Sequence, residues 1–343
     1  MNIANRQRIL IVKVGAIGDV IMALPMVTEI RRSHPEAKIS WLCGRIPGDL
    51  LKLVPDIDEL IEIDETQLLR GTFLARMAVL IGVWWKLLGH SFDLICVGHS
   101  DPRYRYLALT CRAGTRRSFA DSHALIPGRH HTFEYVRLIS GKDGPDANGF
   151  VSQPALKLSA PTDIIGRAAG VPLVILAPGG AQNVMRTDAL RRWPLEHYAT
   201  LAKNLIARGM KVAIVGAQSD SYVRHAFLHI DVVDLIGRTD LSSLISTIAA
   251  ADMVVSHDSS AGHIACLTGT SQIGLFGPTM MAEKLFPREN SVGLWGGEHL
   301  ACRPCYDGKN YHRCPSNLCM QDISVAKVTG LVLEKLGGTV PAP

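Results

Sequence analysis

Short apolar runs alternate with helical patterns along this chain, and the alternation restarts half-way. The apolar runs lie at 9–14, 38–43, 93–98, 173–176, 211–215, 232–236, 252–256 and 272–276. The helical patterns lie at 19–33, 67–88, 195–208, 241–250 and 261–267. Buried strands joined through helices are typical of parallel sheets. The sequence therefore predicts an α/β protein with two doubly wound, Rossmann-like domains that face a central cleft.

A linker separates the two halves. Residues 154–172 contain three prolines and two glycines, residue types that interrupt regular structure. We predict one domain over 1–160 and a second over 161–343. A length of 343 residues suffices for two hydrophobic cores.

Charge and hydropathy limit the partners and the location. A formal net charge of +5 is mild; it suits an anionic ligand or a membrane surface, and we expect no nucleic acid. Lys13 and Asp19 interrupt the first apolar run, which favours a strand over a signal peptide. The apolar stretch 77–85 is too short to span a bilayer. We therefore predict a cytoplasmic protein.

Ligands of doubly wound sheets bind beyond the carboxyl ends of the strands. The first such turn, Gly15-Ala16-Ile17-Gly18-Asp19, lacks the spacing of the dinucleotide fingerprint and of the Walker A loop. An oxidoreductase is therefore disfavoured. Asp19 has two interpretations, a helix N-cap or a carboxylate base at the mouth of a cleft.

Three further turns, all in the second half, carry donors suited to a diphosphate. Residues 257–263 (HDSSAGH) offer more polar groups than a helix cap needs, although Asp258 or Ser259 also makes a plain cap. Arg191 can neutralise a diphosphate; the alternative is a solvated arginine before a helix start. The other candidates are Gly179, Gly180, Thr187 and the loop that contains Thr279.

These turns, in this order and spacing, resemble glycosyltransferase family 9, the ADP-heptose:lipopolysaccharide heptosyltransferases. The matching segments lie between residues 9 and 279; they are IVKVGAIGDVIMALPMVTEIRRSHP, LAPGG, RRWPLEHYATLAKNL, KVAIVGAQSD and GRTDLSSLISTIAAADMVVSHDSSAGHIACLTGTSQIGLFGPT. The resemblance implies a GT-B fold and single-displacement transfer with inversion, without a catalytic cofactor. It implies an acceptor-binding first domain and a second domain that binds the nucleotide-sugar donor, ADP-heptose.

The resemblance also implies roles for single residues. Asp19 matches the family's general base, and Arg191 would stabilise the departing diphosphate. The positions that would bind the donor are Gly18, Gly179, Gly180, Thr187, Asp220, Thr239, Asp258, Ser259, Ser260, Ala261, His263 and Thr279. Lysine is usual where Arg191 stands, and glycine is usual where Ser260 stands. A transferase for another nucleotide sugar, a related epimerase and a non-catalytic binding protein therefore remain as alternatives.

Basic residues of the first half are candidates for an anionic glycan or lipid-linked acceptor. No acid interrupts the stretch that contains Arg103, Arg105, Arg116 and Arg117, although such a run is usually a solvated face. The helix with Trp84-Trp85-Lys86 fits a peripheral position at the inner membrane and fits core packing equally well.

Four cysteines cluster near the C-terminus, at Cys302, Cys305, Cys314 and Cys319. Four thiolates so close in sequence suit a closed tetrahedral site for zinc or iron. A similar cluster in the dodecameric autotransporter heptosyltransferases looks like an iron site. Because such a site has no open position, we predict a structural metal.

Overall fold

The computed structural model describes residues 6–121, 123–141, 152–158, 165–182, 184, 187–308 and 310–337. The chain divides into two compact units. One consists of Met1–Lys157 with Asn183–Met185, and the other of Leu158–Gln182 with Arg186–Pro343. The main division therefore falls between Lys157 and Leu158, close to the boundary predicted after residue 160.

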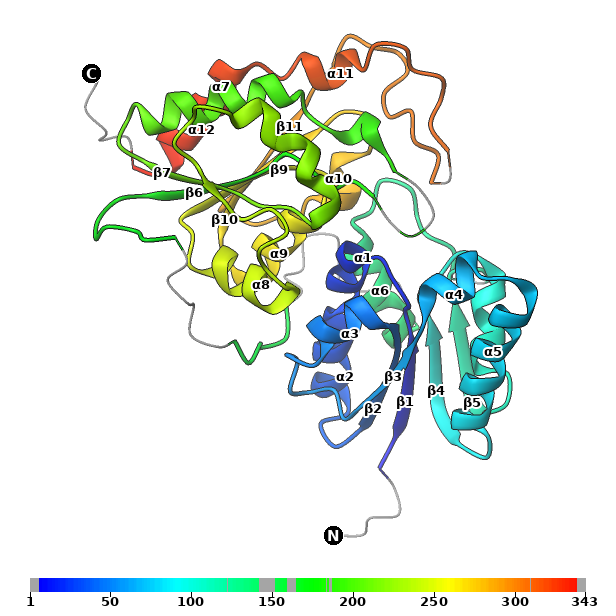
Figure 1. The fold of residues 1–343 in the computed structure, drawn as a ribbon. Helices are drawn as coiled ribbons and strands as arrows, with labels where there is room; N and C mark the ends of the chain where they lie inside the picture. The colour runs from blue at the N-terminus through cyan, green and yellow to red at the C-terminus, as the bar shows by residue number, and fades with distance from the viewer. Residues whose placement is uncertain are drawn as a thin grey trace. The chain divides into compact units, whose positions relative to one another are not determined.

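The first unit is built on a five-stranded parallel sheet (Figure 1). Its strands, in spatial order, are β3 (Glu59–Ile63), β2 (Lys38–Gly44), β1 (Arg8–Val12), β4 (Ser91–Val97) and β5 (Arg112–Ser118). The sequence pattern revealed β1, β2 and β4. It missed β3 and β5 because both carry charged residues, which are common on the edge strands of a sheet.

Two long helices predicted in the first half are each divided in the structure. The pattern at 19–33 forms α1 (Ile17–Ala23) and α2 (Pro25–Ser33), because Pro25 has no N–H to continue α1. The pattern at 67–88 forms α4 (Glu65–Arg70) and α5 (Phe73–Leu87). There Gly71 adopts an extended conformation, and the hydroxyl of Thr72 caps α5 by accepting from the N–H of Ala75.

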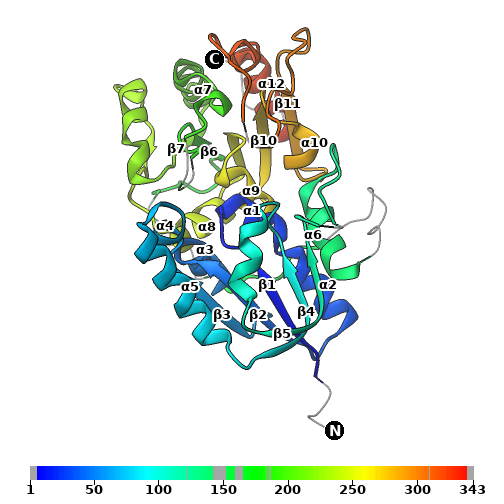
Figure 2. The same cartoon turned by 90° about the vertical axis from the view of Figure 1, so that its right-hand side faces the viewer.

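The core of the first unit follows from the alternation of side chains along each strand. Leu10 and Val12 of β1 face a cluster that contains Val83 and Leu87 of α5. Helices α2 and α6 (His131–Ser140) lie on the other side of the sheet (Figure 2). The remaining elements are α3 (Arg45–Leu51) and the 3₁₀ helix η2 (Pro102–Ala108).

The second unit contains a six-stranded parallel sheet. Its spatial order is β11 (Ser291–Trp295), β10 (Ser271–Phe276), β9 (Met253–His257), β6 (Leu173–Ala177), β7 (Lys211–Ile214) and β8 (Val233–Asp234). All predicted strands of this half are present, and β11 is additional. The expected fold class, α/β with two parallel sheets, is therefore confirmed.

Helices cover both faces of the second sheet (Figure 1). On one face, α7 (Leu195–Ile206) and α12 (Val325–Lys335) pack on the strands through residues such as Leu201 and Val332. On the other face lie α8 (Leu241–Ala249) and α9 (Ser260–Thr268). The shorter helices are η3 (Ala189–Arg191), η4 (Gln218–Phe227), α10 (Met281–Lys284) and α11 (Leu318–Gln321).

None of the helices in the described ranges has the length and hydropathy that a membrane-spanning segment requires.

Candidate active site

Asp19 lies in the first turn of α1, beyond the carboxyl end of β1. The N-cap of α1 is Ala16, which makes no side-chain capping bond; the interpretation of Asp19 as an N-cap is therefore wrong. Its carboxylate Oδ2 lies 3.0 Å from Nζ of Lys13, and its side chain is 40% exposed. Asp19 is therefore a solvent-accessible carboxylate that a cation holds in place.

Lys13 is the partner that the sequence analysis did not identify. Its side chain is buried, and its ammonium lies 5.7 Å from the centre of the Tyr135 ring. Burial alone would lower the pKa of Lys13, but Asp19 and the Tyr135 hydroxyl outweigh it and raise the pKa above 10.5. Lys13 therefore remains a cation at physiological pH.

His99, at the end of β4, completes this end of the first sheet. Its Nε2 accepts a hydrogen bond of 3.0 Å from the N–H of Val14, so the neutral ring carries its proton on Nδ1. Burial and the nearby charge of Lys13 lower the pKa of His99 well below 6.5. The ring of Tyr104 stacks on it at 3.6 Å. His99 therefore orients the turn after β1 as a neutral group.

In the second unit, Asp258 and Arg191 form a charged pair at the carboxyl end of β9. Nη1 of Arg191 lies 3.2 Å from Oδ2 of Asp258, and Nη2 contacts Asp188. Burial alone would raise the pKa of Asp258, but Arg191 outweighs it and the pKa lies below 3.8. Asp258 is therefore ionised, and it fixes the guanidinium of Arg191 at the edge of the loop.

Asp220 organises the loops that follow β6 and β7. Its two carboxylate oxygens accept hydrogen bonds of 2.8 Å from the N–H groups of Gly180 and Ala217. A Cβ at position 179 would lie 2.5 Å from the carboxyl carbon of Asp220, so only glycine permits this close approach. Asp220 is buried. The geometry assigns it to positioning the glycine loop, whereas the resemblance implies contact with the donor.

Arg192 also acts on this loop. Its guanidinium donates two hydrogen bonds, of 3.1 and 2.8 Å, to the carbonyl oxygen of Gly180 and lies 5.2 Å from the centre of the Tyr222 ring. The structure places it beneath the glycine loop, where it holds the backbone in position.

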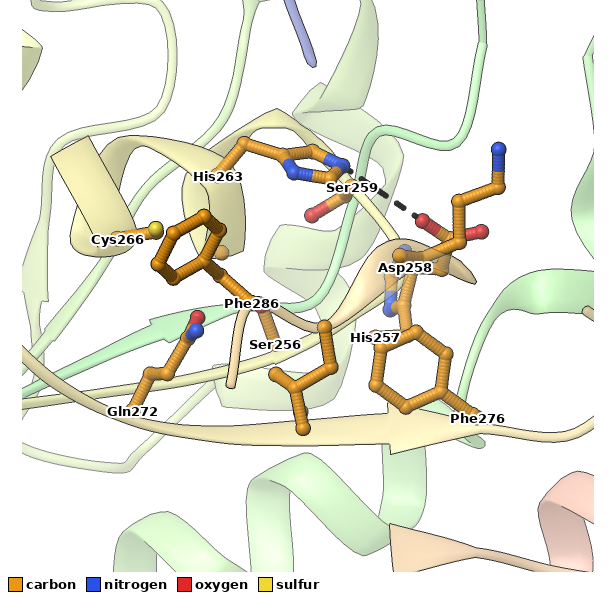
Figure 3. A pocket seen from close by; sticks show the side chains of 13 residues that line it. Ser256, His257, Asp258, Ser259, His263, Cys266, Gln272, Phe276 and Phe286 are labelled. Atoms are coloured by element: carbon orange, nitrogen blue, oxygen red, sulfur yellow. Dashed lines mark ion pairs between the residues drawn. The ribbon is translucent and has the colours of Figure 1, made fainter. Parts of the chain in front are cut away.

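A small cavity lies between β9, α9 and β10 (Figure 3). Asp258, Ser259, His263 and Gln272 contribute to its lining, and His263 Nε2 lies 3.8 Å from Oδ1 of Asp258. Its volume of about 20 Å³ leaves room for a water molecule and not for a nucleotide sugar. A donor would therefore contact these loops from outside the cavity.

His257 lies beneath the loop, fully buried. The Tyr198 hydroxyl lies 3.2 Å from its Nδ1 and accepts a hydrogen bond of 3.1 Å from its backbone N–H. Burial and then Arg191 lower the pKa of His257 to about 3. This histidine is therefore a neutral structural group.

The structure brings several other predicted donor residues to the same edge. Ser260 and Ala261 begin α9, the Ser259 Cβ lies 3.6 Å from the place of a Cβ at Gly180, and Thr279 is buried in the loop after β10. Thr187 instead bridges to Gln182 in an exposed position. Thr239 precedes α8 and Gly18 lies in α1, so neither lies on the loops around Asp258.

The four predicted acceptor arginines do not form one patch. Arg116 and Arg117 are consecutive in β5 and point to opposite faces. Arg116 donates to the carbonyls of Ala108 and Cys111, and Arg117 to those of Leu138 and Ile139 at the end of α6. Arg103 and Arg105 are exposed on η2 and pair with Asp101 and Asp121. The acids that pair with these two arginines, Asp101 and Asp121, lie just outside the acid-free stretch.

The four clustered cysteines lie in one lobe of the second unit. Burial and then the other thiols of the cluster raise the pKa of Cys305, and they raise that of Cys319 to about 11. The N–H of Asn317 donates to Sγ of Cys314 at 3.3 Å. Among the described residues, no three His, Cys, Asp or Glu side chains stand close enough together to hold a metal. The thiols are thus neighbours without forming a ligand set in this conformation.

The lobe that contains the clustered cysteines also interacts with the segment of Arg191 and Arg192. Tyr311 carries a hydroxyl that is electrostatically coupled to Arg191, and its ring stacks on Tyr306 at 4.7 Å. Nδ2 of Asn317 donates to the carbonyl of Arg192 at 3.3 Å. No sequence motif pointed to Tyr311, because this electrostatic interaction joins segments far apart along the chain.

A match to a protein-family model shows which family the chain belongs to. The model described as "Glycosyltransferase family 9 (heptosyltransferase)" matches residues 112–314, more than half of the chain. The chain belongs to glycosyltransferase family 9. It is therefore a glycosyltransferase, as the resemblance implied.

Known proteins similar to this family 9 chain span nearly its whole length. The lipooligosaccharide heptosyltransferase 2 of Haemophilus influenzae is 25% identical over 338 residues, which cover 89% of this chain and 94% of that protein. The structure of ADP-heptose lps heptosyltransferase II from E. coli matches with a TM-score of 0.72 and 19% identity, over 96% of this chain and 98% of that one. The fold of this family 9 member is therefore GT-B-like.

A third similar structure contains iron. The iron-containing dodecameric glycosyltransferase TibC from enterotoxigenic E. coli H10407 matches with a TM-score of 0.59 and 12% identity, over 98% of this chain and 77% of that one. At this identity the likeness concerns the fold.

Proposed function

We propose that this protein transfers heptose from ADP-heptose to the core of a lipopolysaccharide, with inversion at the anomeric carbon. The observation that carries the proposal is the near full-length similarity to curated heptosyltransferases of family 9. Two further features support it. A carboxylate lies in the turn after β1, and the buried carboxylate of Asp258 pairs with Arg191 at the carboxyl end of β9 in the second sheet.

Asp19 acts as the general base in this proposal. Its carboxylate takes the proton of the acceptor hydroxyl while that oxygen forms a bond to the anomeric carbon. The bond from the anomeric carbon to the diphosphate oxygen breaks on the opposite side, and ADP leaves with the bonding pair. Lys13 keeps the carboxylate ionised and correctly oriented. Asp19 is the catalytic residue that the first unit supplies.

Arg191 stabilises the charge that develops on the departing diphosphate. Its guanidinium is already fixed by Asp188 and Asp258, so no reorganisation is needed when the charge appears. Gly179, Ser259 and Ser260 provide backbone and hydroxyl donors at the same edge, and Gly180, whose N–H is bonded to Asp220, shapes the loop. Further donor contacts from Gly18, Thr187, Thr239, Ala261, His263 and Thr279 are part of the proposal.

The first unit binds the acceptor and the second binds the donor. Of the basic residues on the first unit, Arg103 and Arg105 are exposed and are the side chains we assign to anionic groups of the acceptor. Arg116 and Arg117 instead donate to carbonyl groups of their own unit and stabilise its structure. We place the reaction in the cytoplasm.

We propose that one structural iron or zinc ion is bound by the four clustered cysteines, Cys302, Cys305, Cys314 and Cys319. Their thiols influence one another and lie in one lobe, which is the neighbourhood that a Cys₄ site needs. TibC, whose fold is similar, contains iron. A fully thiolate-bound metal would brace the lobe that carries Tyr311 and would take no part in transfer.

A binding screen tests the donor assignment. Purified protein is titrated with ADP-heptose, ADP-glucose and UDP-glucose, and the shift of Tm is measured. The expected result is that ADP-heptose gives the largest shift and that Arg191→Ala reduces it, whereas Arg208→Ala, in the turn after α7, leaves it unchanged. A larger shift with UDP-glucose would contradict the assignment of the donor.

A further inference from the structure

Helix α5 has an exposed face that is as apolar as its buried one. Val83 and Leu87 point into the core of the first unit. At 100° per residue, Leu74, Ala78, Ile81 and Trp85 fall on the opposite side of the helix; we call these four residues the α5 stripe. The side chains of Leu74, Ile81 and Trp85 are 77%, 55% and 78% exposed. A single exposed apolar residue is ordinary, but a continuous stripe marks an interaction surface.

The segment next to α5 extends this surface. Nε1 of Trp84 donates to the carbonyl of Tyr106 at 2.6 Å, and the hydroxyl of Thr110 donates to the carbonyl of Trp84 at 2.9 Å. These bonds attach η2 to α5. They leave Tyr106 and Leu109 55% and 58% exposed. The apolar surface is therefore broader than one helix.

The charges of α5 indicate what covers the stripe. The helix contains two cations and no acid. Arg76 falls on the side opposite the stripe and donates to the carbonyl of Leu69, whereas Lys86 follows Trp85 at the edge of the stripe. A second copy of the chain, docked symmetrically on this face, would bring Lys86 to the interface without an acid of α5 to pair with it. An anionic lipid surface instead attracts Lys86 while it buries the apolar residues. Tryptophan is also the residue that favours the boundary between headgroups and acyl chains.

We infer that α5 lies in the surface of an anionic membrane, with the α5 stripe buried among the lipids and Lys86 among the headgroups. With 15 residues, α5 is shorter than a bilayer-spanning helix and lies parallel to the surface. The outer position of α5 on the first unit permits this contact without any change in the core (Figure 1). The inference is independent of the proposed reaction, since it concerns binding to lipid.

Co-sedimentation with vesicles tests this inference. The full-length protein is incubated with vesicles of phosphatidylcholine, with or without phosphatidylglycerol, at low and high salt. We expect binding to the anionic vesicles that weakens with salt. The variant Ile81→Glu/Trp85→Glu should lower the partition coefficient by about tenfold or more, because both side chains lose a favourable apolar burial. The matched control is Leu228→Glu/Leu158→Glu, which places the same charge at two exposed apolar residues of the second unit; it should bind as the wild type.

Fluorescence gives a second readout that does not depend on a disruptive variant. The emission of the wild type should shift to shorter wavelength when anionic vesicles are added. Trp85→Phe should keep the binding and lose much of that shift. Equal binding of the double variant and the wild type, or no binding of the wild type to anionic vesicles, would overturn the inference. So would a dimer in the absence of lipid that the double variant dissociates.

Discussion

At the scale of single residues, the decisive feature is the pairing of each candidate catalytic group with a buried partner of opposite charge. Asp19 is held by Lys13, and Arg191 by Asp188 and Asp258. The sequence indicated Asp19 and Arg191 because both follow strand ends in recognisable segments. It could not indicate Lys13 as a partner, since a lysine within an apolar strand has no distinctive spacing.

Removal of Lys13 should shift the pH dependence of transfer. Lys13→Met removes the cation that favours the ionised form of Asp19, so the acid limb of the pH–rate profile should move to higher pH. The variant should remain folded, because methionine fills a similar volume in the buried site. The measurement is the profile of kcat/KM against pH. The control is Lys52→Met, at an exposed lysine between α3 and β3. An unchanged profile would contradict the role of Lys13.

His257 should make stability depend on pH below neutrality. Its folded-state pKa of about 3 lies below the ordinary 6.5, so the unfolded chain takes up a proton that the folded chain does not. The free energy of unfolding should therefore fall as the pH drops from about 6.5 towards 3, by roughly 1.4 kcal/mol per pH unit from this group. Urea unfolding at several pH values measures the slope. His257→Asn should flatten it; an equally steep slope in that variant would contradict the assignment.

At the scale of elements, the turns at strand ends were predictable, whereas the segments that support them were not. The loops after β6 and β9 were found from their glycines and hydroxyls. β5 was missed because an edge strand with three arginines resembles a solvated run. The two long helical patterns were divided by Pro25 and by Gly71 with Thr72, which are local signals that a periodicity search passes over. The electrostatic interaction of Tyr311 with Arg191 depends on the tertiary fold.

Removal of the Asp220 carboxylate should lower the stability of the protein more than it lowers the affinity for the ligand. Asp220→Ala leaves the N–H groups of Gly180 and Ala217 without their acceptor, at a cost of about 1–3 kcal/mol in the free energy of unfolding. Asp231→Ala, at an exposed acid of the same unit, should change little. Urea unfolding with and without ADP separates the two roles. A loss of ADP affinity in Asp220→Asn at unchanged stability would favour direct contact with the donor instead.

The cysteine lobe should contain one metal ion per chain. Elemental analysis of freshly purified protein should give about one iron or zinc, as a single Cys₄ site requires. Cys305→Ser should lower metal content and Tm together, because metal binding and local folding are coupled. Cys266→Ser, at a buried thiol outside the cluster, should keep the metal. Metal-free protein whose four clustered thiols react freely with an alkylating reagent would defeat the proposal.

At the scale of the whole molecule, the two α/β units, each built on a parallel sheet, carry the proposed base Asp19 and the proposed diphosphate partner Arg191 on separate sheets. The alternation of apolar strands and helices made this architecture predictable, because a parallel sheet imposes the same pattern wherever it occurs. The sugar and the acceptor were not predictable in the same way, since they depend on side chains such as Arg191 and Ser260 that differ from the usual pattern.

The most direct test of the account is the mass of the product formed from ADP-heptose and a heptose-deficient lipopolysaccharide core. The wild type should add one heptose to the core and release ADP. Asp19→Asn should slow this transfer by about 10²–10⁴-fold while it keeps the Tm shift with ADP-heptose, and Asp49→Asn, at an exposed acid of α3, should transfer at the wild-type rate. Wild-type transfer by Asp19→Asn, or no transfer by the wild-type protein, would contradict the account.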